Sequence, residues 1–145
     1  MVQQQWTSIK VAERVREAAE TLRLLPDHHP GRRYRGAWPE YLRDPAEAYG
    51  YGTFEPRPAP PKAAAIDRMD EVVMDWMKLA EPEDIRFMWS WAVGVPAAAV
   101  GRRLQLHRST VHRHRMAAFK KLAVALNRAG RPVREADIAH FLPPE

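Results

Sequence analysis

An all-α fold is predicted by three features of this sequence of 145 residues. Apolar residues recur at the three- and four-residue spacing of amphipathic helices in several segments. Proline and glycine stand at the ends of these segments, where helices stop and start. No convincing run alternates apolar and polar residues as a half-buried strand does. We therefore expect helices throughout, arranged in three parts: residues 1–26, 27–61 and 62–145.

Residues 1–26 form one predicted amphipathic helix. Thr7 or Ser8 can cap its start, and Pro26 ends it. Its other face is charged, so the apolar stripe is a candidate homodimer surface. The stripe consists of Val11, Val15, Ala18, Ala19, Leu22 and Leu25.

Residues 27–61 form a predicted irregular linker, rich in proline, with a stiff extended end between Pro56 and Pro61. All four tyrosines and Trp38 lie within residues 34–51. These aromatic residues would either contact a protein or DNA, or cover a core too small to close itself; we favour the second interpretation.

Residues 62–145 contain a predicted series of helices. The first begins near Lys62, and its stripe is Ile66, Met69, Val73, Trp76 and Leu79 or Ala80. Pro82 suits the first position of the next helix, whose apolar segment 85–93 we expect at the buried centre, with Gly94 ending it. A short terminal helix is expected around residues 136–142.

The spacing of the last long helices predicts a helix-turn-helix: a scaffold helix at 96–104, a turn at 105–107 and a recognition helix at 108–127. Gly101 supplies the small residue needed where the two helices cross. Gln105 and His107 depart from the glycine and the serine or threonine common in such turns. The wedge between the helices is expected to hold Val100, Leu104, Leu106 and Val111.

Charge is concentrated in the same region. Residues 92–134 hold ten Lys or Arg and no Asp or Glu, while the rest of the chain holds 13 basic and 18 acidic residues. Such an asymmetry indicates an electrostatic surface for a polyanion, although a solubilising surface is the alternative.

Residues 82–126 resemble the promoter-binding fourth region of bacterial sigma factors and the helix-turn-helices of response regulators. The shared features are the acidic PED helix start, a glycine before the scaffold helix, and a Thr-Val pair followed by a basic stretch and an Ala- and Leu-rich tail. GAWPEYLRD (36–44) and AAAIDRMDEV (63–72) also resemble an uncharacterised family of small alphaproteobacterial and phage proteins. Only the helix-turn-helix resemblance implies a function, which is DNA binding.

On the predicted recognition helix, the first turns would face base edges in the major groove. The candidate base readers are His107, Arg108, Ser109, His112 and Arg113. The candidate phosphate contacts are Arg102, Arg103, Arg115, Lys120 and Lys121. His114 is expected to be a partly buried packing residue.

Other chemistries are disfavoured. The chain has no cysteine, and His107, His112 and His114 lack the three- or four-residue spacing of a helical metal site. Ser109 has no acid or glycine-rich turn beside it, so we expect no enzyme. No cofactor or small-molecule ligand is evident, and the sequence lacks a membrane span or a signal peptide.

We therefore expect a cytoplasmic, nucleoid-associated transcriptional regulator that binds double-stranded DNA as a homodimer. A phage or prophage origin is compatible with this expectation. Two alternatives stay open: a sigma-like accessory factor that binds RNA polymerase, and a ring-forming phage DNA-packaging subunit of the small terminase type. The sequence leaves open the target site, the sign of regulation and the oligomeric state.

Overall fold

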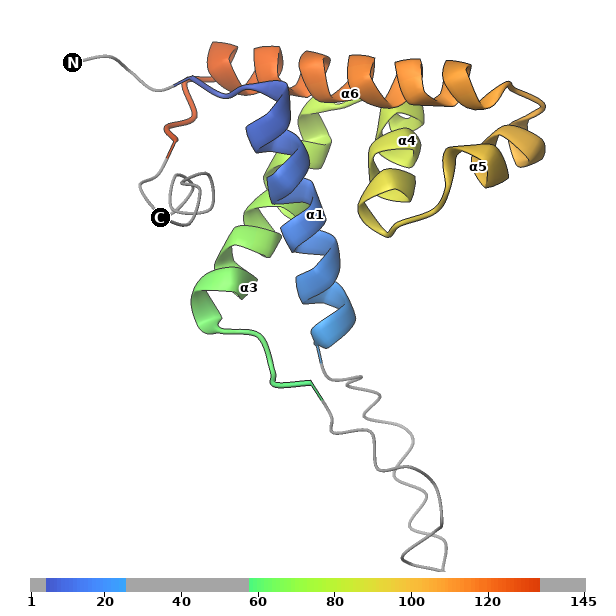
Figure 1. The fold of residues 1–145 in the computed structure, drawn as a ribbon. Helices are drawn as coiled ribbons and strands as arrows, with labels where there is room; N and C mark the ends of the chain where they lie inside the picture. Colours follow the sequence, from blue (N-terminus) through green and yellow to red (C-terminus); the bar gives the residue numbers. More distant parts are fainter. Residues whose placement is uncertain (1–4, 26–57, 134–145) are drawn as a thin grey trace, which may run out of the picture.

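The computed structural model describes residues 5–25 and 58–133, and within these ranges all regular structure is helical (Figure 1). The all-α prediction is confirmed. Most of the expected linker, including the aromatic cluster, and the expected terminal helix lie outside the described residues. The elements are α1 (Ser8–Leu24), α3 (Ala63–Asp70), the π-helical turn η1 (Glu71–Asp75), the 3₁₀ turn η2 (Trp76–Leu79), α4 (Pro82–Ala92), α5 (Ala97–Leu104) and α6 (Arg108–Arg128).

The longest helix, α6, organises the fold. At 21 residues it is about 31 Å long. Helices α1, α4 and α5 all meet α6 from the same side, as Figure 1 shows, and α3 lies beside α1. Buried residues follow one face of α6: Val111, Arg115, Ala118, Phe119, Leu122, Ala123 and Leu126. Within the described ranges, the opposite face of α6 is left uncovered.

Helix α1 begins where the sequence predicts. The Thr7 hydroxyl caps it by accepting from the Lys10 amide. The apolar stripe of α1 does not stand apart from the rest of the chain, because Val11, Val15 and Ala18 are buried in one core with α3, α4 and α6. Most of the face expected to mediate dimerisation is therefore covered, with Leu22 left 37% exposed, and α1 belongs to the same packed body as residues 63–128.

The segment from Ala63 to Leu79 changes helical geometry partway along. Its α-helix passes into the π turn η1 and then into the 3₁₀ turn η2. A π turn adds a residue to the helical repeat and shifts the face that follows. Val72 is buried while Val73 is only partly buried, and Leu79 is 43% exposed. The expected stripe is thus correct at Met69 and Trp76, and Ile66, Val73 and Ala80 pack against the same core. The Leu79 option is wrong, and the buried Val72 was not expected.

Helix α4 begins at Pro82 as predicted and ends before Gly94. Phe87 and Met88 are buried, but Val93 is 54% exposed. Residues 85–93 are therefore not buried on every side, contrary to the prediction from their apolar composition; one end of the segment is exposed.

The N-terminal segment is fastened to the C-terminal end of α6. The Trp6 amide donates to the Asn127 side-chain oxygen at 2.8 Å, and the Asn127 side-chain amide donates to the Trp6 carbonyl at 3.0 Å. The buried Trp6 ring packs edge-on against Trp76, and its indole N–H donates to the Arg131 carbonyl. This long-range contact closes one end of the core.

An ion-pair network joins α1 to α3. Glu17 accepts hydrogen bonds from Arg14, at 2.8 Å, and from Arg68. Burial acts to raise the pKa of Glu17, but the bonds from Arg68 and Arg14 outweigh it and lower the pKa below its ordinary value. The charges of Arg14, Glu17 and Arg68 therefore stabilise the contact between α1 and α3.

Candidate nucleic-acid interface

The connection between α5 and α6 has the three-residue length that the sequence predicts. Gln105, Leu106 and His107 separate the two helices, and Gln105 is left-handed at φ 56°. The Gln105 and Leu106 amides both donate to the Gly101 carbonyl, and the bond from Leu106 is the 6→1 bond of a Schellman helix end. A glutamine thus occupies a conformation that glycine would adopt with less strain.

Gly101 is required by a close backbone approach. A Cβ at this position would lie 2.4 Å from the Leu106 carbonyl oxygen and 3.6 Å from the Arg108 amide nitrogen. The small residue therefore accommodates the turn and the first residue of α6, and not only a helix crossing. Any other side chain would push the turn away from α5.

His107 caps α6, although histidine is a poor predicted cap. Its Nδ1 accepts from the Ser109 amide at 3.3 Å and lies 2.7 Å from the Ser109 hydroxyl. Both polar groups are therefore engaged with each other at the helix start.

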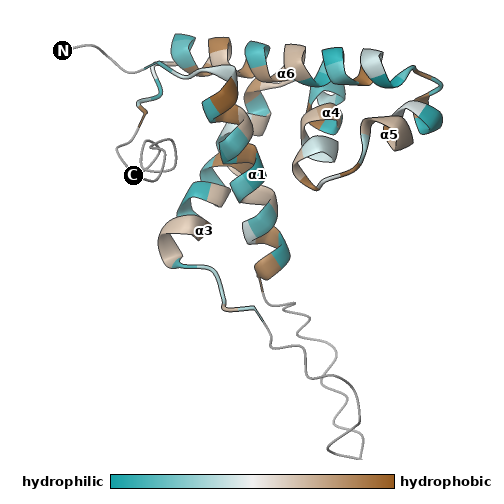
Figure 2. Cartoon of the chain, in the orientation of Figure 1, coloured by the Kyte–Doolittle hydropathy of each residue, from teal (hydrophilic) through white to brown (hydrophobic). Residues whose placement is uncertain are grey.

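The wedge between α5 and α6 is only partly as expected. Val111 is fully buried, and Val100 and Leu106 are partly buried. Leu104 is 50% exposed, so its assignment to the wedge is wrong. It sits in the last turn of α5 beside Arg102 and Arg103, the hydrophilic end of that helix in Figure 2.

The five candidate base readers separate into different environments. Arg108 and Arg113 are exposed, and neither has an ion pair within the described residues. His107 and Ser109 are exposed but hydrogen-bonded to each other. His112 is also exposed, but it lines a pocket toward α1 and α4. Arg108 and Arg113 are therefore the candidates that remain unengaged.

The candidate phosphate contacts need one clear correction. Arg115 is only 5% exposed and donates to the Ser90 hydroxyl at 3.1 Å and the Val95 carbonyl at 2.8 Å. It therefore braces α6 against the end of α4, and it is not a surface group able to reach a phosphate. The sequence misleads here because Arg115 occupies the core face of α6, four residues after Val111.

Lys121 is exposed, but its ammonium lies 3.1 Å from the carboxylate of Asp84 at the start of α4. Arg102, Arg103 and Lys120 are exposed and without an ion pair in the described part of the chain. Arg128, which we did not assign to phosphate contact from the sequence, shares this state at the end of α6. The sequence signal that points to Arg128 is its place in residues 92–134, which hold no acidic residue.

His114 packs against α4, although it is more exposed than expected. Its ring stacks on Phe87 with the ring centres 4.8 Å apart and the planes inclined by 8°. The imidazole is therefore held against α4.

Six basic side chains of α5 and α6 are thus exposed and unpaired among the described residues. They are Arg102, Arg103, Arg108, Arg113, Lys120 and Arg128. Acidic residues are absent from sequence positions 92–134, so nothing within these helices offsets the charge. Such a surface attracts polyanions and small anions alike.

Within residues 5–25 and 58–133, no three histidine, aspartate or glutamate side chains gather as a metal site would require. No helix in these ranges is sufficiently long and apolar to span a bilayer.

Comparison with known families places the chain in one group. Residues 23–122 match a domain of unknown function, DUF6362, and the chain belongs to this family. The match includes α3, α4 and α5 and most of α6. No curated protein matches the chain, and no solved structure matches it.

Proposed function

We propose that this protein is a double-stranded-DNA-binding transcriptional regulator that uses α5 and α6 as a helix-turn-helix. In this proposal α5 is the scaffold helix, and the first turns of α6 enter the major groove. The observation that carries it is the group of six unpaired cations on α5 and α6, with no carboxylate between positions 92 and 134. The short turn and the close approach at Gly101 support the same arrangement.

The six cations divide by position. Arg108 and Arg113 lie in the first two turns of α6, where a recognition helix meets base edges, and arginine bonds guanine O6 and N7 in bidentate fashion. Arg102 and Arg103 end α5, while Lys120 and Arg128 lie further along α6. These four are proposed to contact phosphates and set the register of the helix on DNA.

One recognition helix reads a short site, so a second copy would supply useful specificity. The apolar stripe of α1 is in the core, so the proposed homodimer uses a different surface. Two copies on one face of DNA would place their recognition helices about 34 Å apart.

The experiment is fluorescence anisotropy of the full chain with a labelled mixed-sequence duplex at several salt concentrations. Each phosphate contact releases counterions and adds about 0.9 to the slope of log affinity against log salt. Four to six contacts predict a slope between about −3.6 and about −5.4. A flat salt dependence, or no binding at low salt, would overturn the proposal.

The alternatives give different results in the same preparations. A sigma-like factor would be retained by RNA polymerase without binding the free duplex. A terminase-type subunit would form a ring, and its mass in solution would be several times the 16.7 kDa of one chain.

A further inference from the structure

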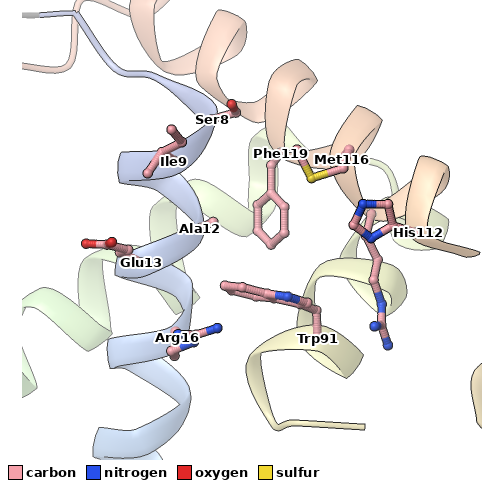
Figure 3. A pocket seen from close by; sticks show the side chains of 10 residues that line it. Ser8, Ile9, Ala12, Glu13, Arg16, Trp91, His112, Met116 and Phe119 are labelled. Carbon is pink, nitrogen blue, oxygen red and sulfur yellow. The ribbon is translucent and has the colours of Figure 1, made fainter. Parts of the chain in front are cut away.

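A pocket of about 240 Å³ lies between α1, α4 and α6, on the side of α6 away from its uncovered face (Figure 3). Its walls are mainly apolar and aromatic: Ile9 and Ala12 from α1, Trp91 from α4, and Met116 and Phe119 from α6. Trp91 and Phe119 meet edge to face with ring centres 5.2 Å apart. The two ring planes are inclined by 74°, so they form an aromatic corner of the pocket.

Arg115 also lines this pocket, and its buried charge is uncompensated within the described residues. Its guanidinium donates only to neutral oxygens, those of Ser90 and Val95, and its Nε has no hydrogen-bond partner. Arginine is rarely this buried unless it is paired with an anion. Burial accordingly lowers the pKa of Arg115 below its ordinary value.

A second guanidinium, on α1, also lines the pocket. Arg16 of α1 stacks over the Trp91 ring, 4.3 Å from its centre. Arg16 is exposed and forms no ion pair within the described ranges. Its position over the indole leaves its charge beside the mouth of the pocket.

Two of the three charged lining residues, Arg16 and Arg115, are cationic. Glu13 is the one carboxylate among the lining residues, and Figure 3 shows it pointing away from Trp91. Two guanidiniums beside an aromatic corner complement a planar molecule that carries a negative charge.

We propose that this pocket binds a small aromatic carboxylate, with its ring beside Trp91 and Phe119 and its carboxylate at the exposed guanidinium of Arg16. The buried charge of Arg115 adds to the positive potential of the pocket. The volume is below the roughly 300–1,000 Å³ of sites for drug-sized ligands, which limits the ligand to one or two rings. This proposal does not rest on the proposed DNA binding, although the pocket includes His112 from the first turns of α6, and its test needs no DNA.

The test is a titration of the ¹⁵N-labelled full chain with indole-3-carboxylate, followed through the tryptophan indole N–H resonances. Replacing Trp91 with Phe assigns its resonance. A ligand of this size should bind with a dissociation constant of about 0.1–1 mM. We expect a saturable shift at Trp91 that is larger than any shift at Trp6, which does not line the pocket.

Two controls test the charge. Uncharged indole should bind at least tenfold more weakly, and Arg16→Gln should weaken indole-3-carboxylate at least tenfold. Arg86→Gln removes an exposed arginine of α4 that does not line the pocket, so it should leave binding unchanged. Arg16 is exposed, so its replacement leaves the core intact.

Three results would overturn the proposal. The first is the absence of a saturable shift up to about 10 mM, well above the expected dissociation constant. The second is equal affinity for indole and for indole-3-carboxylate. The third is an equal loss of binding in Arg16→Gln and Arg86→Gln.

Discussion

The charged residues of α1 and α3 differ sharply in their surroundings from those of α5 and α6. Between α1 and α3, Arg14 and Arg68 both bond Glu17, and the network lies at a helix contact. On α5 and α6, six cations are exposed and without an ion pair within the described residues. The first set stabilises the fold, while the second leaves its charge available to a ligand.

This difference separates residues that can be changed without loss of folding from those that cannot. Charge alone does not decide the matter, because Arg115 belongs to the basic stretch in sequence but to the core in structure. Burial and partners together assign each basic residue to one role. Substitutions at these residues test the assignments.

Gly101→Ala should destabilise the fold by about 3 kcal/mol, because the added methyl would collide with the Leu106 carbonyl. Alanine has a higher helix propensity than glycine, so without the collision this substitution would stabilise the fold. A loss of stability therefore reports the collision. Gly130→Ala is the matched control: nothing lies within 4 Å of its added Cβ, and only its positive φ is penalised. Thermal unfolding that is equal for Gly101→Ala and wild type would contradict the close approach.

Glu17→Gln should lower the free energy of unfolding by about 2 kcal/mol at neutral pH, since it removes the negative charge that accepts from both Arg14 and Arg68. Glu20→Gln, exposed on the same helix, serves as the control. Urea titrations of both variants and the wild type would measure the difference.

The same network predicts a pH dependence. The folded-state pKa of Glu17 is lowered, so its stabilisation is present above the ordinary pKa of 4.5 and is lost as the pH falls through the lower folded value. The wild type should lose this stability on acidification, and Glu17→Gln should lack that part of the loss. Parallel curves for the two proteins would exclude this role for Glu17.

Arg113→Ala and Lys120→Ala should weaken DNA binding in different ways. Loss of Arg113, a proposed reader, should weaken the preferred site roughly tenfold and flatten preference at one base position. Loss of Lys120, a proposed phosphate contact, should weaken all sequences alike. Binding to a randomised duplex pool, read by sequencing, measures both effects, and identical profiles would refute the division.

Gln105→Gly should stabilise the protein slightly, by about 0.5–1 kcal/mol, because glycine adopts the left-handed conformation without a side-chain clash. The helix ends at Gly94 and Gly130 already use glycine in this way. The increase is the smallest expected effect and is read from thermal unfolding. A loss of stability would show that the Gln105 side chain contributes contacts of its own.

Much of the helical layout could be predicted from local signals. The cap at Thr7, the start at Pro82 and the three-residue turn before Arg108 all follow from residue types that act within one helical turn. The region of concentrated positive charge could also be read from the sequence, because acidic residues are missing from a long stretch.

The remaining features depend on contacts distant in sequence. Trp6 and Asn127 are far apart in the chain, and no periodicity indicates that they bond. The π turn shifts the buried face of residues 71–79. The burial of Arg115 could not be predicted because the residues around it in the sequence are also basic. The pocket at Trp91 was missed because α1, α4 and α6 each supply only part of its wall.

The most direct test of DNA binding by α5 and α6 compares two double variants of equal net charge. Arg108→Gln/Arg113→Gln removes two unpaired cations from α6, and Arg23→Gln/Arg86→Gln removes two exposed arginines from α1 and α4. Duplex affinity, measured by anisotropy at one salt concentration, should fall at least tenfold more in the first variant. Equal losses would mean that only net charge matters, and would contradict a DNA-binding role specific to α6.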